Sequence, residues 1–143
     1  MVAVSADGIR LPIARARVTK AARAVLKAER VRGAILSVTF VTNSRIRAMN
    51  RRHLRRDRVT DVIAFHFRRT AKRAPVVGDV YIAPDVARKS AAEAGIRVRE
   101  ELIRLVVHGT LHVLGHDHPE GPARTKSAMW RKQERLVRRI AAS

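Results

Sequence analysis

A short stretch of the chain, His108–His118, has the residue types and the spacing of a metal site. It reads H-G-T-L-H-V-L-G-H-D-H and contains four of the chain's six histidines. His108 and His112 are four residues apart, so a helix places them one turn apart on the same face. Gly115 can end that helix with a left-handed turn and bring His118 back towards the other two rings. Three converging imidazoles suit a tetrahedral zinc ion with one open position, although copper, nickel and iron also accept imidazole.

The same ligand spacing occurs in zinc peptidases, whose pattern is H-E-x-x-H-x-x-G-x-x-H. All three ligand positions and the glycine are present, but Gly109 stands where those enzymes have a glutamate as general base. A glycine cannot accept a proton, so the pattern indicates a hydrolase metal centre without the peptidase base. The missing glutamate and the strong positive charge both argue against a metalloprotease.

Other interpretations of the histidines stay open at this point. The rings could be ordinary core or surface residues, although three at this spacing with a glycine between them are hard to assign to packing. The ion could also be structural, in a closed site with His116 or Asp117 as fourth ligand. Structural sites usually contain cysteine, and this chain has none. Asp117 could instead orient a ligand histidine or stabilise a turn, and His116 could lie beside the ligands or at the surface.

The composition favours one globular domain, residues 1–143, with a polyanionic partner. Apolar residues make up 46% of the 143 residues, which is enough for a hydrophobic core. The formal net charge is +19, from 31 basic and 12 acidic side chains, and this favours nucleic acid. A codon bias towards arginine explains the preference over lysine better than it explains the excess over acidic residues. Aromatic residues are few, so contact with the phosphate backbone is expected rather than base stacking.

The N-terminal region and the cysteine content bear on location. Charged residues interrupt the first 20 residues, so we expect no signal peptide. No apolar run reaches the roughly 18 residues of a membrane span. The absence of cysteine excludes disulfides and is compatible with a reducing cytosol. These features predict no membrane contact and are compatible with a cytoplasmic location.

Five arginines stand within residues 51–58. Such a run is usually a solvated loop, but beside a metal site it could equally hold phosphate groups. The candidate RNA-binding residues are Arg51, Arg52, Arg55, Arg56 and Arg58.

The hydrophobic pattern predicts the elements that position these residues. Strands are predicted near Val2–Val4 and at Ala34–Val41, Thr60–Phe67 and Gly78–Ala83. Helices are predicted at Ile13–Glu29, from Thr42 to about His53, and at Pro84–Ala94, Arg97–Leu114 and Ala123–Ala142. In the last helix Met129, Gln133 and Leu136 are interpreted as part of a packed side. The order predicts an α+β fold: a single domain with a small mixed sheet of about four strands packed against helices, around a central metal-bearing helix.

Three motifs together resemble the YbeY family of bacterial endoribonucleases. The histidine stretch resembles that family's H-G-x-L-H-L-x-G-[YH]-D-H. The segment M-N-(x6)-D-R-V-T-D-V-I-A-F resembles N-(x6)-D-x-P-T-[DN]-V-L-S-F, and V-G-D-V-Y-I resembles L-G-D-I-x-I. The matches span about Met49–His118 in the expected order.

This resemblance implies that His108, His112 and His118 hold one zinc ion. It implies a cytoplasmic endoribonuclease that acts on single-stranded RNA through metal-activated water, with the ribosome or ribosomal proteins as partners. Its roles would be rRNA processing, including maturation of the 16S rRNA 3′ end, and ribosome quality control. The alternative is a non-catalytic ribosome-assembly factor that binds RNA and holds a structural zinc.

The chain departs from the family at a position associated with RNA cleavage. Many members have an arginine four residues after the asparagine that matches Asn50, and here that residue is Leu54. The general base is not identified by the sequence. The remaining catalytic candidates are Arg55, Arg56 and Asp117.

Overall fold

The computed structural model describes residues 1–55 and 57–142 and has the predicted order of elements. Its strands are β1 (Val2–Asp7), β2 (Ala34–Val41), β3 (Val62–Phe67) and β4 (Val76–Ile82). Its helices are α1 (Arg15–Ala28), α2 (Asn43–Leu54), α3 (Pro84–Ala94), α4 (Val98–Val113) and α5 (Ala128–Ala142), with a 3₁₀ helix η1 (Gly121–Lys126) before α5. Within residues 1–55 and 57–142, no helix is both long enough and apolar enough to cross a bilayer.

The four strands form one mixed sheet in the order β1-β2-β4-β3. β1, β2 and β4 are parallel, and β3 pairs antiparallel with β4. Alternation along β2 determines which face is buried: Leu36, Val38 and Phe40 are buried, while Ile35 on the other face is exposed. These observations confirm the predicted α+β fold with a four-stranded mixed sheet.

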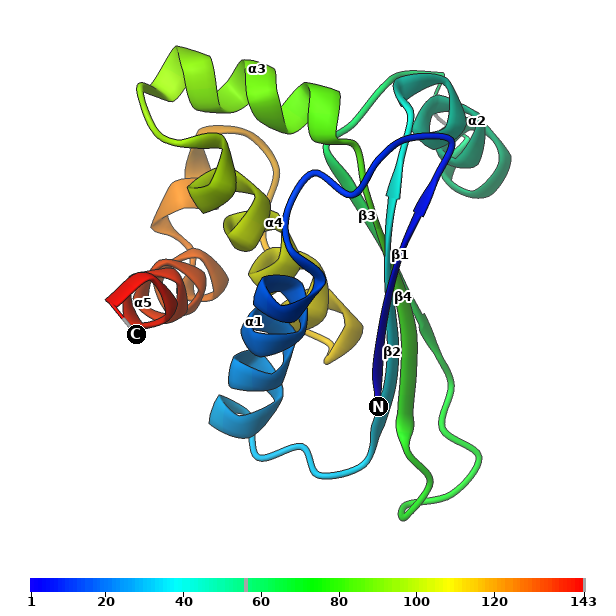
Figure 1. Ribbon diagram of the computed structural model, residues 1–143. Helices are drawn as coiled ribbons and strands as arrows, with labels where there is room; N and C mark the ends of the chain where they lie inside the picture. The colour runs from blue at the N-terminus through cyan, green and yellow to red at the C-terminus, as the bar shows by residue number, and fades with distance from the viewer. Residues whose placement is uncertain (56, 143) are drawn as a thin grey trace.

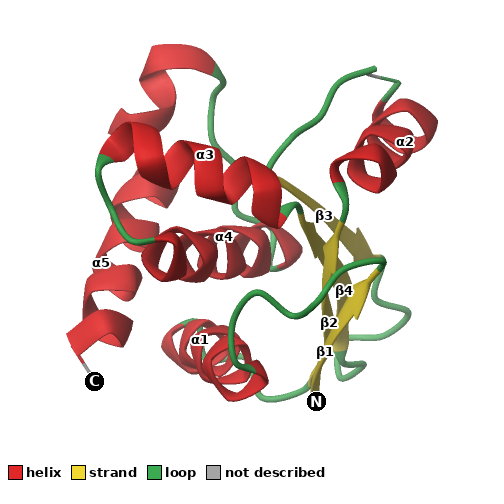
Figure 2. Ribbon diagram, turned by 45° about the horizontal axis from the view of Figure 1, so that its top comes forward, coloured by secondary structure: helices red, strands yellow, loops and turns green. Residues whose placement is uncertain are grey.

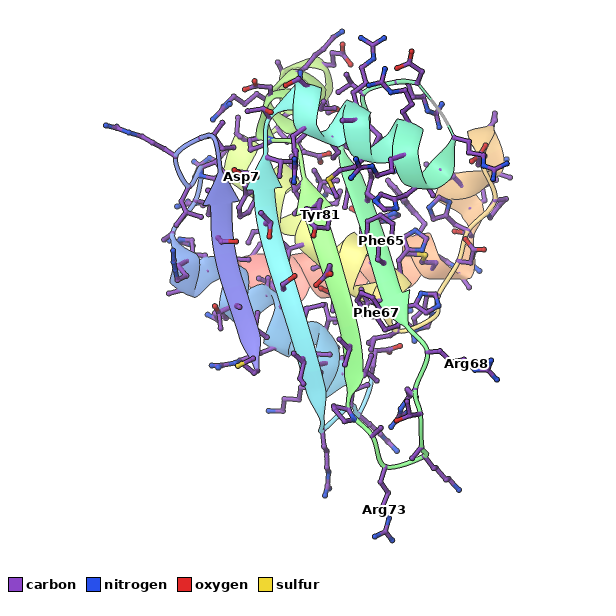
Figure 3. All side chains as sticks on the ribbon, turned by 90° about the vertical axis from the view of Figure 1, so that its right-hand side faces the viewer. Asp7, Phe65, Phe67, Arg68, Arg73 and Tyr81 are labelled. Carbon is purple, nitrogen blue, oxygen red and sulfur yellow. The ribbon has the colours of Figure 1, made fainter. Side chains whose placement is uncertain are left out.

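Helices α1, α4 and α5 lie on one side of the sheet, and α2 lies on the other side near one end (Figure 1). The face that carries α2 is otherwise open over much of its area, and Phe65, Phe67 and Tyr81 lie along it (Figure 3). The main hydrophobic core lies between the sheet and the helices on the covered side.

Helix α4 is at the centre of the helical layer, as Figure 2 shows. It packs against α1, α3 and α5 and against strands β3 and β4. Ten of its sixteen residues are buried. Two glycines allow the close approach to β4: Gly78 lies against Val113, and a Cβ atom on Gly109 would come within 2.5 Å of Val80 Cγ1. The predicted central helix is confirmed.

Most predicted bounds agree with the structure to within two or three residues, but the start of the last helix was wrong. The last helix begins at Ala128 rather than Ala123, because Gly121 and Pro122 open a separate 3₁₀ turn and Ser127 then has an extended backbone. The Ser127 hydroxyl accepts a hydrogen bond from the Trp130 backbone N–H at 3.1 Å and so begins α5. Helix α2 ends at Leu54, one residue after the predicted His53, so the first two arginines of the 51–58 run lie on its last turn.

Candidate metal centre

Helix α4 places the first two histidines of the motif side by side. His108 and His112 are one turn apart, and their ring centroids are 4.6 Å from each other. His108 is buried, with 6% of its surface exposed, and His112 is half-buried. The helical spacing therefore produces the juxtaposition that the sequence predicts.

A glycine turn brings the third histidine to the same place. Gly115 has φ +98°, and the N–H groups of Gly115 and His116 donate back to the carbonyls of His112 and Leu111, each at 3.0 Å. This pair of bonds is a Schellman motif, which ends the helix and reverses the chain. The His118 ring consequently lies 5.0 Å from His108 and 5.1 Å from His112, between ring centroids. One ligand nitrogen from each of the three rings can be chosen so that all three lie within 4.8 Å of one another.

Each of the three rings is held by a hydrogen bond. His108 Nδ1 lies 2.5 Å from Gln133 Oε1, and His118 Nδ1 lies 3.0 Å from the Pro119 carbonyl oxygen. His112 forms a hydrogen bond with the backbone of His116. An imidazole that donates Nδ1–H to an oxygen has its Nε2 lone pair free for a metal.

The surroundings keep two of these rings neutral. Burial lowers the pKa of His108 to about 4, although the hydrogen bond with Gln133 acts in the opposite direction. Burial and the neighbouring His118 lower the pKa of His112. Neutral imidazole is the form that binds metal, so the donor set fits a divalent ion such as zinc.

The cluster opens onto a cavity of about 640 Å³. His108, His112 and His118 line one part of it, and Arg58 and Arg124 also line it. The Arg124 guanidinium lies 5.5 Å from the centroid of the Trp130 ring, a cation–π distance. Cavity space beside the three nitrogens leaves room for a water molecule and a phosphate group.

The two residues considered as fourth ligands are engaged elsewhere. His116 Nε2 pairs with the Glu29 carboxylate, which also accepts from Lys132 Nζ at 2.8 Å. Asp117 Oδ1 accepts the backbone N–H of His118 at 2.8 Å, as in a turn. Within the described residues the metal-ligating cluster contains three donors, and neither His116 nor Asp117 belongs to it.

The arginine candidates differ in whether they line the cavity. Arg58 lines the cavity, whereas Arg51, Arg52 and Arg55 are exposed and do not line it. Arg56 lies outside the described residues. Leu54 lines the cavity, so the position at which this chain departs from the resembled family pattern faces the candidate site.

Two residues at the site were not identified from the sequence. Gln133 was interpreted only as part of a packed helix side, and Arg124 was not singled out. The signal for Gln133 was present, because it is the chain's single glutamine within an otherwise apolar stripe, and a buried amide needs hydrogen-bond partners. Nothing in the sequence distinguishes Arg124 from the many other arginines.

Gly109, at the position of the peptidase glutamate, faces the sheet. An added Cβ would meet both methyl groups of Val80, at 2.5 and 3.1 Å, and Val62 Cγ2 at 3.4 Å. A glutamate side chain therefore has no room here. Close helix–sheet packing thus accounts for the missing peptidase base.

Comparison with known proteins agrees with this geometry. The family model described as "Endoribonuclease YbeY" matches residues 6–141. The Geobacillus kaustophilus endoribonuclease YbeY is 41% identical over 117 residues, covering 76% of this chain and 74% of that protein. The Anaeromyxobacter dehalogenans endoribonuclease YbeY is 40% identical over 132 residues, covering 92% of this chain and 66% of that protein.

A solved structure supports the fold. The solution structure of a Thermotoga maritima protein superposes with a TM-score of 0.65 and 22% identity, covering 99% of this chain and 90% of the other. With the family model spanning nearly the whole sequence and relatives at about 40% identity, the chain belongs to the YbeY endoribonuclease family.

Proposed function

We propose that this protein is a zinc-dependent endoribonuclease that cleaves single-stranded RNA. The observation that carries the proposal is the histidine cluster: three imidazole donors within 4.8 Å, opening onto a cavity that two arginines also line. Family membership and the net charge of +19 support RNA as the substrate.

His108, His112 and His118 are the proposed metal ligands. Three nitrogen donors with space for an exchangeable fourth ligand are typical of catalytic zinc sites, whereas structural sites are closed. A bound zinc ion supplies Lewis-acid stabilisation of phosphoryl oxygens and activates water near neutral pH.

The arginines that line the cavity supply the second part of the proposed chemistry. Arg58 and Arg124 can bind a phosphate group near the cluster and stabilise the negative charge that develops on it. Arg51, Arg52 and Arg55 lie outside the cavity, where exposed cations can attract the flanking RNA backbone. We assign no general base to Asp117, because its Oδ1 is occupied by the backbone N–H of His118.

The decisive experiment compares His112→Ala with His53→Ala. His53 is an exposed histidine outside the cluster, so it controls for purification and for contaminating nucleases. We expect His112→Ala to lose bound zinc and cleavage of single-stranded RNA, and His53→Ala to retain both. Metal analysis and an RNA digest of the same preparations measure this. Cleavage by His112→Ala at the wild-type rate would show that the metal is not catalytic.

We further propose that residues 1–143 act as one domain in the cytoplasm, in rRNA processing and ribosome quality control, with maturation of the 16S rRNA 3′ end as one substrate. Ribosomes or ribosomal proteins are the proposed partners. Co-sedimentation with ribosomal particles and mapping of 16S rRNA 3′ ends in a depleted strain test this. Zinc-loaded wild-type protein that binds RNA without cutting it would instead favour an assembly factor with a structural zinc.

A further inference from the structure

Gln133 contacts a proposed metal ligand from a distant part of the chain. It lies on α5, is 1% exposed, and its Oε1 is 2.5 Å from His108 Nδ1 on α4. Its neighbours on the same side of α5, Met129 and Leu136, are buried in the hydrophobic core. A polar side chain in this setting costs free energy unless its hydrogen bonds are made, so its partners matter.

Two further residues determine which way the Gln133 amide points. Gln133 Nε2 donates to Glu134 Oε2 at 3.0 Å. The Glu134 carboxylate is in turn bound at both oxygens by Arg104, from Nε at 2.8 Å and from Nη2 at 2.9 Å. An ionised carboxylate only accepts hydrogen bonds, so the amide nitrogen must face Glu134 and the amide oxygen must face His108.

The charge state of Glu134 agrees with this order of donors and acceptors. Burial raises the pKa of Glu134, but the hydrogen bonds from Arg104 and Gln133 outweigh it, and the pKa lies below its ordinary 4.5. The carboxylate is therefore ionised at neutral pH. Arg104 is also bound to Glu100 and Glu101, which hold the guanidinium in place.

We propose that Gln133 is a positioning residue for the metal site. Its amide oxygen accepts Nδ1–H of His108, which selects one tautomer of that ring and directs the Nε2 lone pair towards the other two histidines. The Glu134–Arg104 ion pair prevents the amide from flipping. This inference rests on the proposed function, because it assumes that the three histidines bind a metal.

Zinc affinity, measured by competition with a chelator, tests the proposal without using activity. Gln133→Leu removes the acceptor at similar size, and we expect zinc binding to weaken by about 10- to 100-fold, as for other residues that orient a metal ligand. Gln133→Glu keeps an acceptor for His108 but loses the donor to Glu134, so it is combined with Glu134→Gln, whose amide can donate instead, and this double variant should lie closer to wild type. Leu136→Ala is the control for packing on α5, since it should lower the melting temperature without changing zinc affinity.

Folded Gln133→Leu with wild-type zinc affinity would overturn the proposal, as would a folded double variant Gln133→Glu, Glu134→Gln that loses as much affinity as Gln133→Leu. If Gln133→Leu does not fold, Gln133→Asn replaces it, because the shorter amide cannot reach His108 and should also weaken zinc binding.

A second measurement separates this inference from the proposed function. In the metal-free protein, ¹⁵N shifts of the His108 ring report its tautomer. We expect the Nδ1–H form in wild type and loss of that preference in Gln133→Leu. A wild-type protein that binds no zinc but keeps this tautomer would contradict the proposed function while the role of Gln133 in holding the ring stands. An unchanged tautomer in Gln133→Leu would contradict the role of Gln133.

Discussion

Two sets of side chains line the cavity and are held in different ways: the histidine wall (His108, His112 and His118) and the arginine wall (Arg58 and Arg124). On the histidine wall, His108 is buried and each ring is fixed by a hydrogen bond. On the arginine wall, Arg58 is exposed, and its segment is held by the buried Asn50, whose Nδ2 donates to the Arg58 carbonyl at 3.1 Å. The Arg47–Asp57 ion pair beside it is at the surface, with about half of each side chain exposed.

This difference indicates that the histidines bind the metal and the arginines attract the RNA backbone. A metal site depends on a few lone pairs held at defined positions, so losing one donor removes the site. Attraction of a polyanion depends on the summed field of many cations, so losing one cation has a graded effect that salt screens. Loss of one histidine should therefore abolish metal binding, whereas loss of one arginine should only weaken RNA binding.

The largest expected effect is that of His108→Ala. Zinc content and RNA cleavage should both fall to background, while RNA affinity stays within about twofold of wild type, because the cations that attract the phosphates are unchanged. Metal analysis, an RNA digest and a binding titration on one preparation measure all three. A parallel collapse of RNA affinity would show that the two walls are not independent.

The next effect is the response of RNA binding to salt. If about six phosphates of single-stranded RNA are contacted, affinity should fall roughly 300-fold between 50 and 200 mM salt. Arg58→Ala and Arg124→Ala should each reduce the slope of log affinity against log salt by about 1 and leave zinc affinity unchanged. Arg73→Ala is the control, since Arg73 is on the loop between β3 and β4, at the opposite end of the open sheet face from α2 (Figure 3). A flat salt dependence in wild type would exclude binding led by the phosphate backbone.

A smaller effect concerns the packing behind the histidine wall. Gly109→Ala places a methyl group against Val80, whose side chain is fully buried, and overpacking of this kind costs about 1–3 kcal/mol of unfolding free energy. Gly33→Ala is the matched control, because the added Cβ would come no nearer than 3.8 Å to Pro75 Cα, an ordinary van der Waals distance. Denaturant unfolding measures both variants. Equal stability of the two would mean that α4 shifts away from the sheet at little cost.

The smallest effect is a pH dependence arising from Glu134. Its pKa lies below 4.5 in the folded protein, despite burial, because of the hydrogen bonds from Arg104 and Gln133. The unfolded chain therefore takes up the proton first on acidification, so this stabilisation is complete above about pH 4.5 and is lost as the pH falls through the folded pKa. The difference in unfolding free energy between wild type and Glu134→Gln should shrink over that range. A difference that stays constant with pH would contradict the ionised Glu134–Arg104 pair.

Much of the fold could be predicted because its signals are local. The bounds of Ala34–Val41 and Pro84–Ala94 follow from β-branched residues in the first case, and from a proline start and a glycine end in the second. The start of α5 was predicted five residues too early, because helical periodicity alone does not show that Ser127 interrupts the helix.

The sequence by itself determined the histidine cluster. All three rings come from eleven consecutive residues, so helical spacing and one glycine turn are enough to bring them together. Only the tertiary structure decided what surrounds the cluster. Gln133 reaches His108 across 25 residues, and the packing of α5 on α4 brings the two together. Gly109 likewise needs a small side chain only because Val80 of β4 packs against it. Contacts of this kind, between elements far apart in the chain, produce no periodic pattern in the sequence and could not be predicted from it.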